Sequence, residues 1–334
     1  MASSNRCVFR TNPGKTEPWM CGRSLALSSE TGGFQSIRTG LSPSTEYKLD
    51  FQARGDDFWS CIERRSPRRL QSVSMRGPAT SNTPGVMMMD TVKKTFVLVH
   101  GAWHGGWCYR HTAAALRRMG HEVFTPTHTG VGERAHHADQ NISLETHIRD
   151  VAGCIEAEEI SDIILVGHSY GGMVITGLAD RMADRIKALV YLDAFVPDDG
   201  ESLMALLHKA VEPAVAAQFI GGFHSAALEK NSGMTQPLTA EMLHVSPENR
   251  EWVNRRCVPQ ALATFEMPVL LSGKIENVKR RHYILADGWD PSPFRYFARK
   301  YTGAPGWDVI KLPSGHDVMV DLPNELAASL AKIS

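Results

Sequence analysis

The chain has 334 residues, 43% of them hydrophobic, which is enough to bury a large core in one large domain or two smaller ones. Its 36 basic and 36 acidic residues give a net charge of zero, so charge offers no argument for a nucleic-acid partner or an anionic membrane surface. No window reaches the ~18 uninterrupted apolar residues that a membrane-spanning helix needs.

The six cysteines form no CxxC pair and are too sparse for a disulfide scaffold. We therefore expect free thiols in a reducing compartment and a cytoplasmic protein. The sequence carries no pattern that calls for a cofactor or a metal ion, and it leaves the number of subunits open.

Residues 1–90 differ in composition from the rest of the chain. They are rich in Ser, Arg, Gly and Pro, and ten Arg and two Lys outweigh eight acidic residues, for a net charge of +4. The acidic residues argue against a transit peptide, and 66–85 has the composition of a solvated linker. We expect a poorly ordered extension without a function of its own, with Met87, Met88 and Met89 as alternative starts, followed by one domain over 91–334.

From Thr95 onward, apolar runs alternate with amphipathic stretches. The runs predict strands at 96–100, 120–126, 162–168, 188–194, 281–287 and 307–313. The amphipathic stretches predict helices at 111–119, 143–158, 172–183 and 322–333, with Ser143 as the N-cap of the second. Continuous apolar strands alternating with helices indicate an α/β fold, a mostly parallel sheet with helices on both faces.

Residues 197–280 interrupt this alternation with helical pieces and turns. They predict a small helical cap inserted over the carboxyl edge of the sheet. The apolar stretch 203–223 has helical spacing, and two readings that do not exclude each other are a lid over an apolar pocket and a packed cap helix.

A polar serine follows the third predicted strand, in the sequence Gly-His-Ser-Tyr-Gly around Ser169. G-x-S-x-G between a strand and a helix is typical of a tight turn that exposes a nucleophilic serine, with glycines where side chains would collide. The N-terminus of the following helix favours developing negative charge. Ser169 is therefore the candidate nucleophile.

A serine nucleophile needs a base and an acid that orients the base, and in this architecture the chain order is Ser, acid, His. His316 lies between the last strand and the final helix, at the edge where Ser169 is expected. Three residues are candidates for the acid: Asp193 at the end of the fourth strand, Asp287 one strand later, and Asp290. We favour Asp193, because a carboxylate directly after four apolar strand residues has no obvious structural purpose.

Five segments together resemble the α/β-hydrolase superfamily: "FVLVHGAWHGGWCYR", "GHEVFTPTHTGVGE", "ILVGHSYGGMVI", "VYLDAFVPDDGES" and "GHDVMVDLPNELA". The nearest branch is the esterase-like group of plant methylesterases, hydroxynitrile lyases and bacterial carboxylesterases. The resemblance covers about residues 95–334 and not 1–90. It implies Ser169 as nucleophile and His316 as base.

The resemblance also implies an oxyanion hole formed by the backbone N–H groups of Ala102 and Tyr170. In the plant members the acid follows the strand that matches 282–286, where this chain departs from the pattern, whereas an acid at Asp193 resembles some lipases. Hydroxynitrile lyases have Lys directly after the catalytic His. This chain has Asp317 there, and we expect its charge to disfavour cyanide.

The sequence therefore predicts a serine hydrolase that cleaves small to medium, fairly apolar carboxylic esters through Ser169, His316 and Asp193. Two alternatives remain: a C–C or cyanohydrin lyase on the same fold, and a non-enzymatic ligand receptor. Trp103, His104 and Trp107 follow the predicted oxyanion loop, where they either line an acyl pocket or pack in the core.

Overall fold

The computed structural model describes residues 35–37, 47–49, 92–229 and 232–334. The chain divides into two units, Met1–Pro84 and Gly85–Ser334. In the first unit, strand β1 (Gln35–Ile37) pairs antiparallel with β2 (Tyr47–Leu49). The rest of segment 1–90, for which we expected a poorly ordered extension, lies outside the described residues apart from these two strands.

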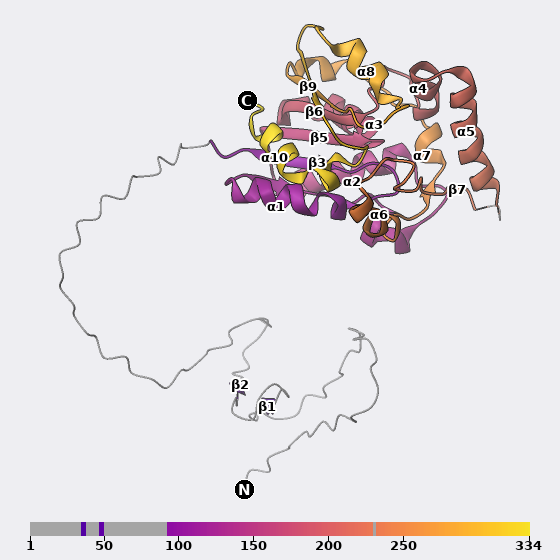
Figure 1. Ribbon diagram of the computed structural model, residues 1–334. Helices are drawn as coiled ribbons and strands as arrows, with labels where there is room; N and C mark the ends of the chain where they lie inside the picture. The colour runs from indigo at the N-terminus through magenta and orange to yellow at the C-terminus, as the bar shows by residue number, and fades with distance from the viewer. Residues whose placement is uncertain (1–34, 38–46, 50–91, 230–231) are drawn as a thin grey trace, which may run out of the picture. The chain divides into compact units, whose positions relative to one another are not determined.

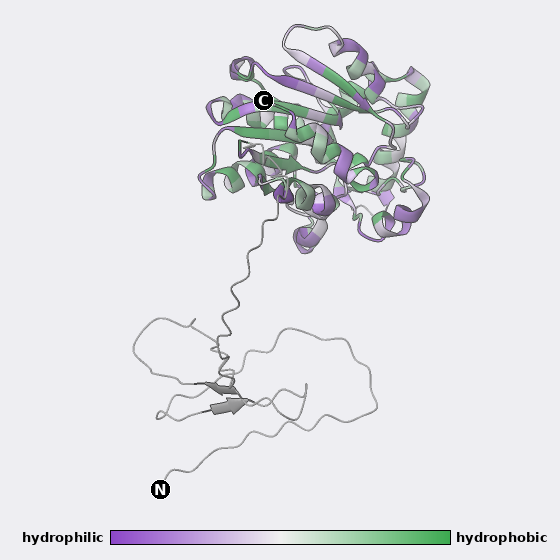
Figure 2. Cartoon of the chain, turned by 60° about the vertical axis from the view of Figure 1, so that its left-hand side comes forward, coloured by the Kyte–Doolittle hydropathy of each residue, from purple (hydrophilic) through white to green (hydrophobic). Residues whose placement is uncertain are grey.

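The second unit is built on a six-stranded parallel sheet with the strand order β10-β9-β6-β5-β3-β4 (Figure 1). Its strands are β3 (Thr95–Val99), β4 (Glu122–Phe124), β5 (Ile163–Ser169), β6 (Ile186–Ala194), β9 (Arg281–Ala286) and β10 (Trp307–Leu312). The predicted α/β class and all six predicted strands are confirmed, with ends that differ by at most two residues. The central strands are hydrophobic along most of their length (Figure 2), because both faces of the sheet are covered.

The four predicted helices are also present, as α1 (Arg110–Arg118), α2 (Leu144–Ala157), α3 (Gly171–Arg181) and α10 (Pro323–Ala331). The N-cap of α2 is Ser143, in a capping box with Thr146. Helix α1 packs against α10, and α2 packs against α3.

The chain turns back on itself at β3, since β4 lies on one side of this strand and β5 on the other. Crossovers between parallel strands are right-handed, so the connection through α1 lies on one face of the sheet and those through α2 and α3 lie on the opposite face. The reversal opens a crevice at the carboxyl ends of β3 and β5, which is where ligands bind in open parallel sheets.

The segment between β6 and β9 forms a cap that gathers at one end of the sheet in Figure 1. It contains α4 (Leu203–Ala210), α5 (Pro213–Leu228), β7 (Met234–Thr235), α6 (Pro247–Asn254), β8 (Gln260–Ala261) and α7 (Ala263–Glu266). The two-residue strands β7 and β8 pair antiparallel and were not predicted. Nor were α8 (Phe294–Tyr301), between β9 and β10, and the short α9 (Val318–Asp321). Within the described ranges, no helix combines the length and apolar character that a membrane span requires.

Candidate active site

Ser169 ends β5 one residue before Tyr170 caps α3, and its backbone is left-handed, with φ of 53°. An L-residue in this conformation is strained, and such strain concentrates at functional sites. The flanking glycines are required by space. A Cβ on Gly167 would lie 2.6 Å from the carbonyl oxygen of Gly171, and one on Gly171 would lie 2.7 Å from that of His100. The structure therefore contains the sharp strand-to-helix turn that the G-x-S-x-G motif predicts.

Ser169 lines a cavity that His316, Ala102 and Tyr170 also line. The rest of the lining is predominantly apolar and comes from both the sheet edge and the cap: Trp103, His104, His168, Phe195, Leu203, Leu207, Phe219, Phe223, Leu238, Leu243, Phe265, Trp289, Pro293 and Phe294. Side chains of both α4 and α5 are among them, so the predicted cap stretch contributes to the pocket. The aromatic and apolar lining suits a planar, apolar ligand.

Asp193 lies behind His316 at the end of β6, fully buried, and its Oδ2 is 2.7 Å from His316 Nδ1. Its other oxygen accepts a hydrogen bond from the backbone N–H of Ala286, at 3.1 Å. Like Ser169, it has a positive φ, here 42°. A buried carboxylate with two N–H donors is satisfied, and it fixes the tautomer in which Nε2 of His316 carries the free lone pair.

The two alternative acids do not reach His316 and form surface ion pairs instead. Asp287 pairs with Arg295 and Lys311, and Asp290 pairs with Arg295 at 3.1 Å. The side chain of Asp290 is 75% exposed. Of the three candidates, only Asp193 contacts the imidazole.

The imidazole of His316 is 4% exposed and lies against two aromatic rings. It stacks on Phe294, with centroids 5.0 Å apart, and tilts toward Trp289 at 4.6 Å. Burial lowers the pKa of His316 to about 4, so the ring is neutral near pH 7 and can accept a proton. Trp289 and Phe294 belong to the stretch that departs from the plant pattern, and we had not identified them as site residues.

Ala102, in the loop after β3, and Tyr170, at the start of α3, line the same pocket. Among the described residues, neither N–H donates one of the loop or turn hydrogen bonds within the protein. Gly101 permits the close approach, because a Cβ there would lie 2.9 Å from the Cβ of Ser169. Trp103, which follows Ala102, is hydrogen-bonded to the cap. Its backbone N–H donates to Gln260 Oε1 at 2.9 Å, and its indole N–H donates to the Thr235 hydroxyl.

Trp103 and His104 line the pocket, whereas Trp107 packs on Trp252, with ring centroids 4.9 Å apart. The sequence does not identify Gln260 and Thr235 as neighbours of the site, because they lie on the two-residue strands β8 and β7. Nothing in the local sequence indicates that this pair touches the loop after β3.

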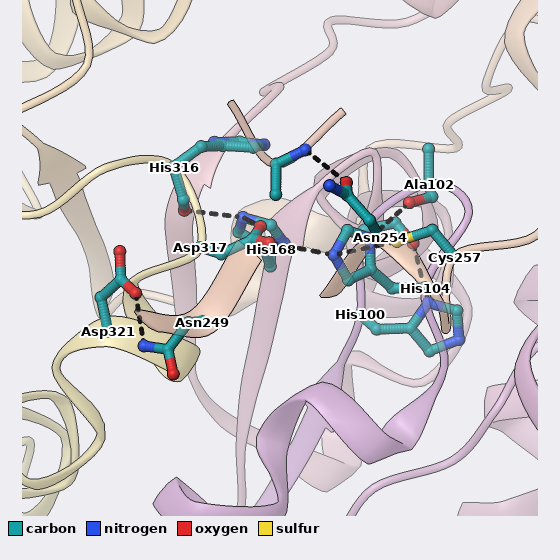
Figure 3. Close-up of polar contacts among 12 residues, drawn as sticks. His100, Ala102, His104, His168, Asn249, Asn254, Cys257, His316, Asp317 and Asp321 are labelled. Atoms are coloured by element: carbon teal, nitrogen blue, oxygen red, sulfur yellow. Dashed lines mark hydrogen bonds and ion pairs between the residues drawn. The ribbon is translucent and has the colours of Figure 1, made fainter. Parts of the chain in front are cut away.

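The expected effect of Asp317 on a cyanide ion stays a prediction, and the structure shows where its carboxylate lies. Its side chain is fully buried, does not line the pocket, and forms an ion pair with His104, with Oδ2 3.1 Å from Nε2 (Figure 3). The sequence does not reveal this pairing, because His104 and Asp317 are 213 residues apart in the chain.

Within the described part of the chain, one group of side chains could converge on a metal ion: His168, His316 and Asp317, with ligand atoms within 4.8 Å of one another. Two of the possible ligand nitrogens already have hydrogen-bond partners. His316 Nδ1 bonds to Asp193, and His168 Nε2 donates to the carbonyl oxygen of His316 at 3.1 Å. The group is better described as a hydrogen-bonded network than as a metal centre.

Comparison with known proteins places the chain among esterases. The carbendazim hydrolyzing esterase of Nocardioides sp. (strain SG-4G) is 71% identical over 238 residues, which are 71% of this chain and 98% of that protein. Esterase PIR7B of Oryza sativa subsp. japonica is 25% identical over 258 residues, or 72% of this chain and 96% of that one.

Solved structures share the fold. An extracellular alpha/beta-hydrolase from a Paenibacillus species has a TM-score of 0.62 at 24% identity and covers 72% of this chain and 99% of its own. A single-residue mutant of methylketone synthase I of tomato has a TM-score of 0.56 at 26% identity, with 72% and 98% covered. The model of the alpha/beta hydrolase family matches residues 96–329. The chain therefore belongs to the alpha/beta hydrolase family, in its esterase branch, and is a carboxylesterase-type hydrolase.

Proposed function

We propose that this esterase cleaves carboxylic and carbamic esters of small aromatic compounds, with Ser169 as nucleophile, His316 as base and Asp193 as the orienting acid. The observation that carries the proposal is the pocket itself. A strained serine and a neutral imidazole line one apolar cavity, and the far side of the imidazole bonds to a buried carboxylate.

The reaction follows from these positions. Ser169 Oγ attacks the carbonyl carbon while His316 Nε2 takes the hydroxyl proton, and the N–H groups of Ala102 and Tyr170 stabilise the oxyanion. The tetrahedral intermediate collapses, the C–O bond to the alcohol breaks, and His316 returns the proton to the departing alcohol. Water, deprotonated by His316, then attacks the acyl or carbamoyl group and releases Ser169.

The aromatic lining and the most similar of the relatives described above support the substrate class. That relative is named for carbendazim, which carries a methyl carbamate on a planar benzimidazole ring. Rings such as Phe223, Phe265 and Trp289 offer offset or edge-to-face contacts to such a heterocycle. No Lys occurs among the described residues that line the pocket, so the ammonium group that hydroxynitrile lyases carry directly after the catalytic His is not found there.

The test is turnover of p-nitrophenyl acetate, p-nitrophenyl butyrate and carbendazim, with mandelonitrile as the lyase substrate. We expect many product equivalents per protein from the esters and the carbamate, and none from mandelonitrile. A fluorophosphonate probe should label the wild type and neither Ser169→Ala nor His316→Ala. Turnover by Ser169→Ala at the wild-type rate would reject the mechanism.

A further inference from the structure

The His104–Asp317 pair lies beside the proposed machinery but is not one of its reacting groups. His104 is 2% exposed and Asp317 is fully buried. His104 Nε2 lies 3.1 Å from Asp317 Oδ2, and its Nδ1 lies 2.7 Å from the carbonyl oxygen of Ala102 (Figure 3). Both ring nitrogens thus face acceptors, and an imidazole donates from both nitrogens only when it is protonated.

The ionisation of the two groups agrees with this arrangement. Burial by itself lowers the pKa of His104, but the neighbouring Cys257 sulfur and the Asp317 carboxylate raise it well above its ordinary value. Burial by itself raises the pKa of Asp317, but the charge and hydrogen bond of His104 bring it below its ordinary range. The pair is therefore an imidazolium and a carboxylate, and each stabilises the charge of the other.

The pair joins two loops that carry different parts of the site. His104 holds the carbonyl group of Ala102, whose N–H is a proposed oxyanion donor. Asp317 directly follows His316, and its Oδ1 lies 3.9 Å from Nε2 of His168, which donates to the carbonyl oxygen of His316. A displacement of one loop relative to the other would therefore have to break a charged hydrogen bond.

We propose that His104 and Asp317 are positioning residues that lock the oxyanion loop to the loop of the catalytic base. Neither touches the reacting atoms. Their contribution is to hold the Ala102 N–H and the His316 imidazole at a fixed separation across Ser169. A displacement of about 1 Å in such a site costs on the order of 10²-fold in rate.

Asp317→Asn tests the inference, because it keeps the shape of the side chain and removes the charge that keeps His104 protonated. A neutral imidazole donates from one nitrogen only, so the charge-assisted hydrogen bond between the two loops is replaced by at most a weaker, neutral one from the amide of residue 317. We expect kcat to fall about 10²-fold with KM changed less than about threefold, since the contact acts on the transition state. The affinity for a trifluoromethyl ketone, whose tetrahedral adduct fills the oxyanion hole, should fall by the same factor as kcat/KM.

Titration with the fluorophosphonate probe counts the protein molecules whose Ser169 reacts. Dividing turnover by this count gives kcat per labelled serine, which separates a loss of positioning from a loss of folded protein. A purely structural role would lower the number of labelled sites and leave kcat per site unchanged. If Asp317→Asn does not fold, the double variant His104→Gln, Asp317→Asn leaves no buried charge, and the same fall in kcat per site is expected. The matched control is His282→Gln, from the His282–Asp308 pair at the start of β9, and it should behave as wild type.

Values of kcat per site within twofold of wild type in both variants would overturn the inference, as would an effect confined to KM. The inference rests on the proposed function, and the two fail differently. Unchanged turnover by Ser169→Ala rejects the proposed function, whereas loss of turnover in Ser169→Ala with normal Asp317→Asn rejects the positioning role alone.

Discussion

Asp193 illustrates how one side chain can hold a site together. It is fully buried, with one oxygen on the His316 imidazole and the other on the Ala286 N–H. Asp193→Asn would present an amide to Nδ1 and favour the wrong imidazole tautomer. We expect kcat/KM to fall about 10⁴-fold.

The control for that change is Asp287→Asn, which removes a half-exposed carboxylate from the pairs with Arg295 and Lys311. Surface ion pairs contribute little, so activity and the melting temperature should stay near wild type. Hydrolysis of p-nitrophenyl butyrate measures both variants. The opposite ranking, with Asp287→Asn inactive and Asp193→Asn active, would reassign the acid.

The His316 imidazole also sets a pH dependence. The base must be neutral to accept the serine proton, and burial lowers its pKa from the ordinary 6.5 to about 4. Activity is therefore present above the lowered pKa and lost as the pH falls through it. We expect the acid limb of kcat/KM to have its midpoint between pH 4 and 6.5, measured over about pH 3.5–9. A midpoint above 6.5 would contradict the dominance of burial.

The sequence identifies Ser169 by the G-x-S-x-G motif and His316 by the chain order Ser, acid, His. Neither signal depends on how the side chains pack. It left three acids open because all of them fall near strand ends at one edge of the sheet. The choice depends on which carboxylate points inward, and a one-residue shift along a strand reverses that direction.

At the scale of elements, the junction of β5 and α3 leaves no room for a side chain at Gly171. A Cβ on Gly171 would lie 2.7 and 2.8 Å from the backbone oxygens of His100 and Val99, which cannot rotate away. We expect Gly171→Ala to destabilise the fold by about 1–3 kcal/mol and to displace Ser169. Urea unfolding and fluorophosphonate labelling would measure these two effects.

Gly153 is the matched control, since it lies exposed in α2 with no atom within 4 Å of an added Cβ. Gly153→Ala should raise stability by about 0.5–1 kcal/mol, because alanine has the higher helix propensity. Equal effects of the two substitutions would mean that the crowding at Gly171 is relieved by backbone movement.

Two of the elements that were not predicted differ in their sequence patterns. Helix α8 has an amphipathic pattern that could have predicted it, whereas the β7–β8 pair has no pattern. The buried residues of α8 are Phe294, Phe297, Ala298 and Tyr301, which have the spacing of an amphipathic helix. The strands β7 and β8 have two residues each, too few for any periodicity. Their pairing depends on the cap folding as a whole.

At the scale of the molecule, every residue of the proposed site belongs to the unit Gly85–Ser334. The family match, residues 96–329, lies within the same unit. We therefore expect a protein that comprises residues 85–334 to keep kcat and KM for p-nitrophenyl butyrate within about twofold of the full chain. A larger loss of kcat would assign a catalytic contribution to residues 1–84.

The sequence by itself determined the parallel sheet and the strand-to-helix turn at Ser169, and it made His316 the candidate base. These depend on local periodicity, on glycines where space forbids a side chain, and on chain order. Only the tertiary structure showed which candidate acid contacts His316, which side chains line the pocket and which residue pairs with Asp317. Each of these joins residues that lie far apart in the chain, as His104 and Asp317 do, and the sequence contains no local pattern that records how distant loops pack together.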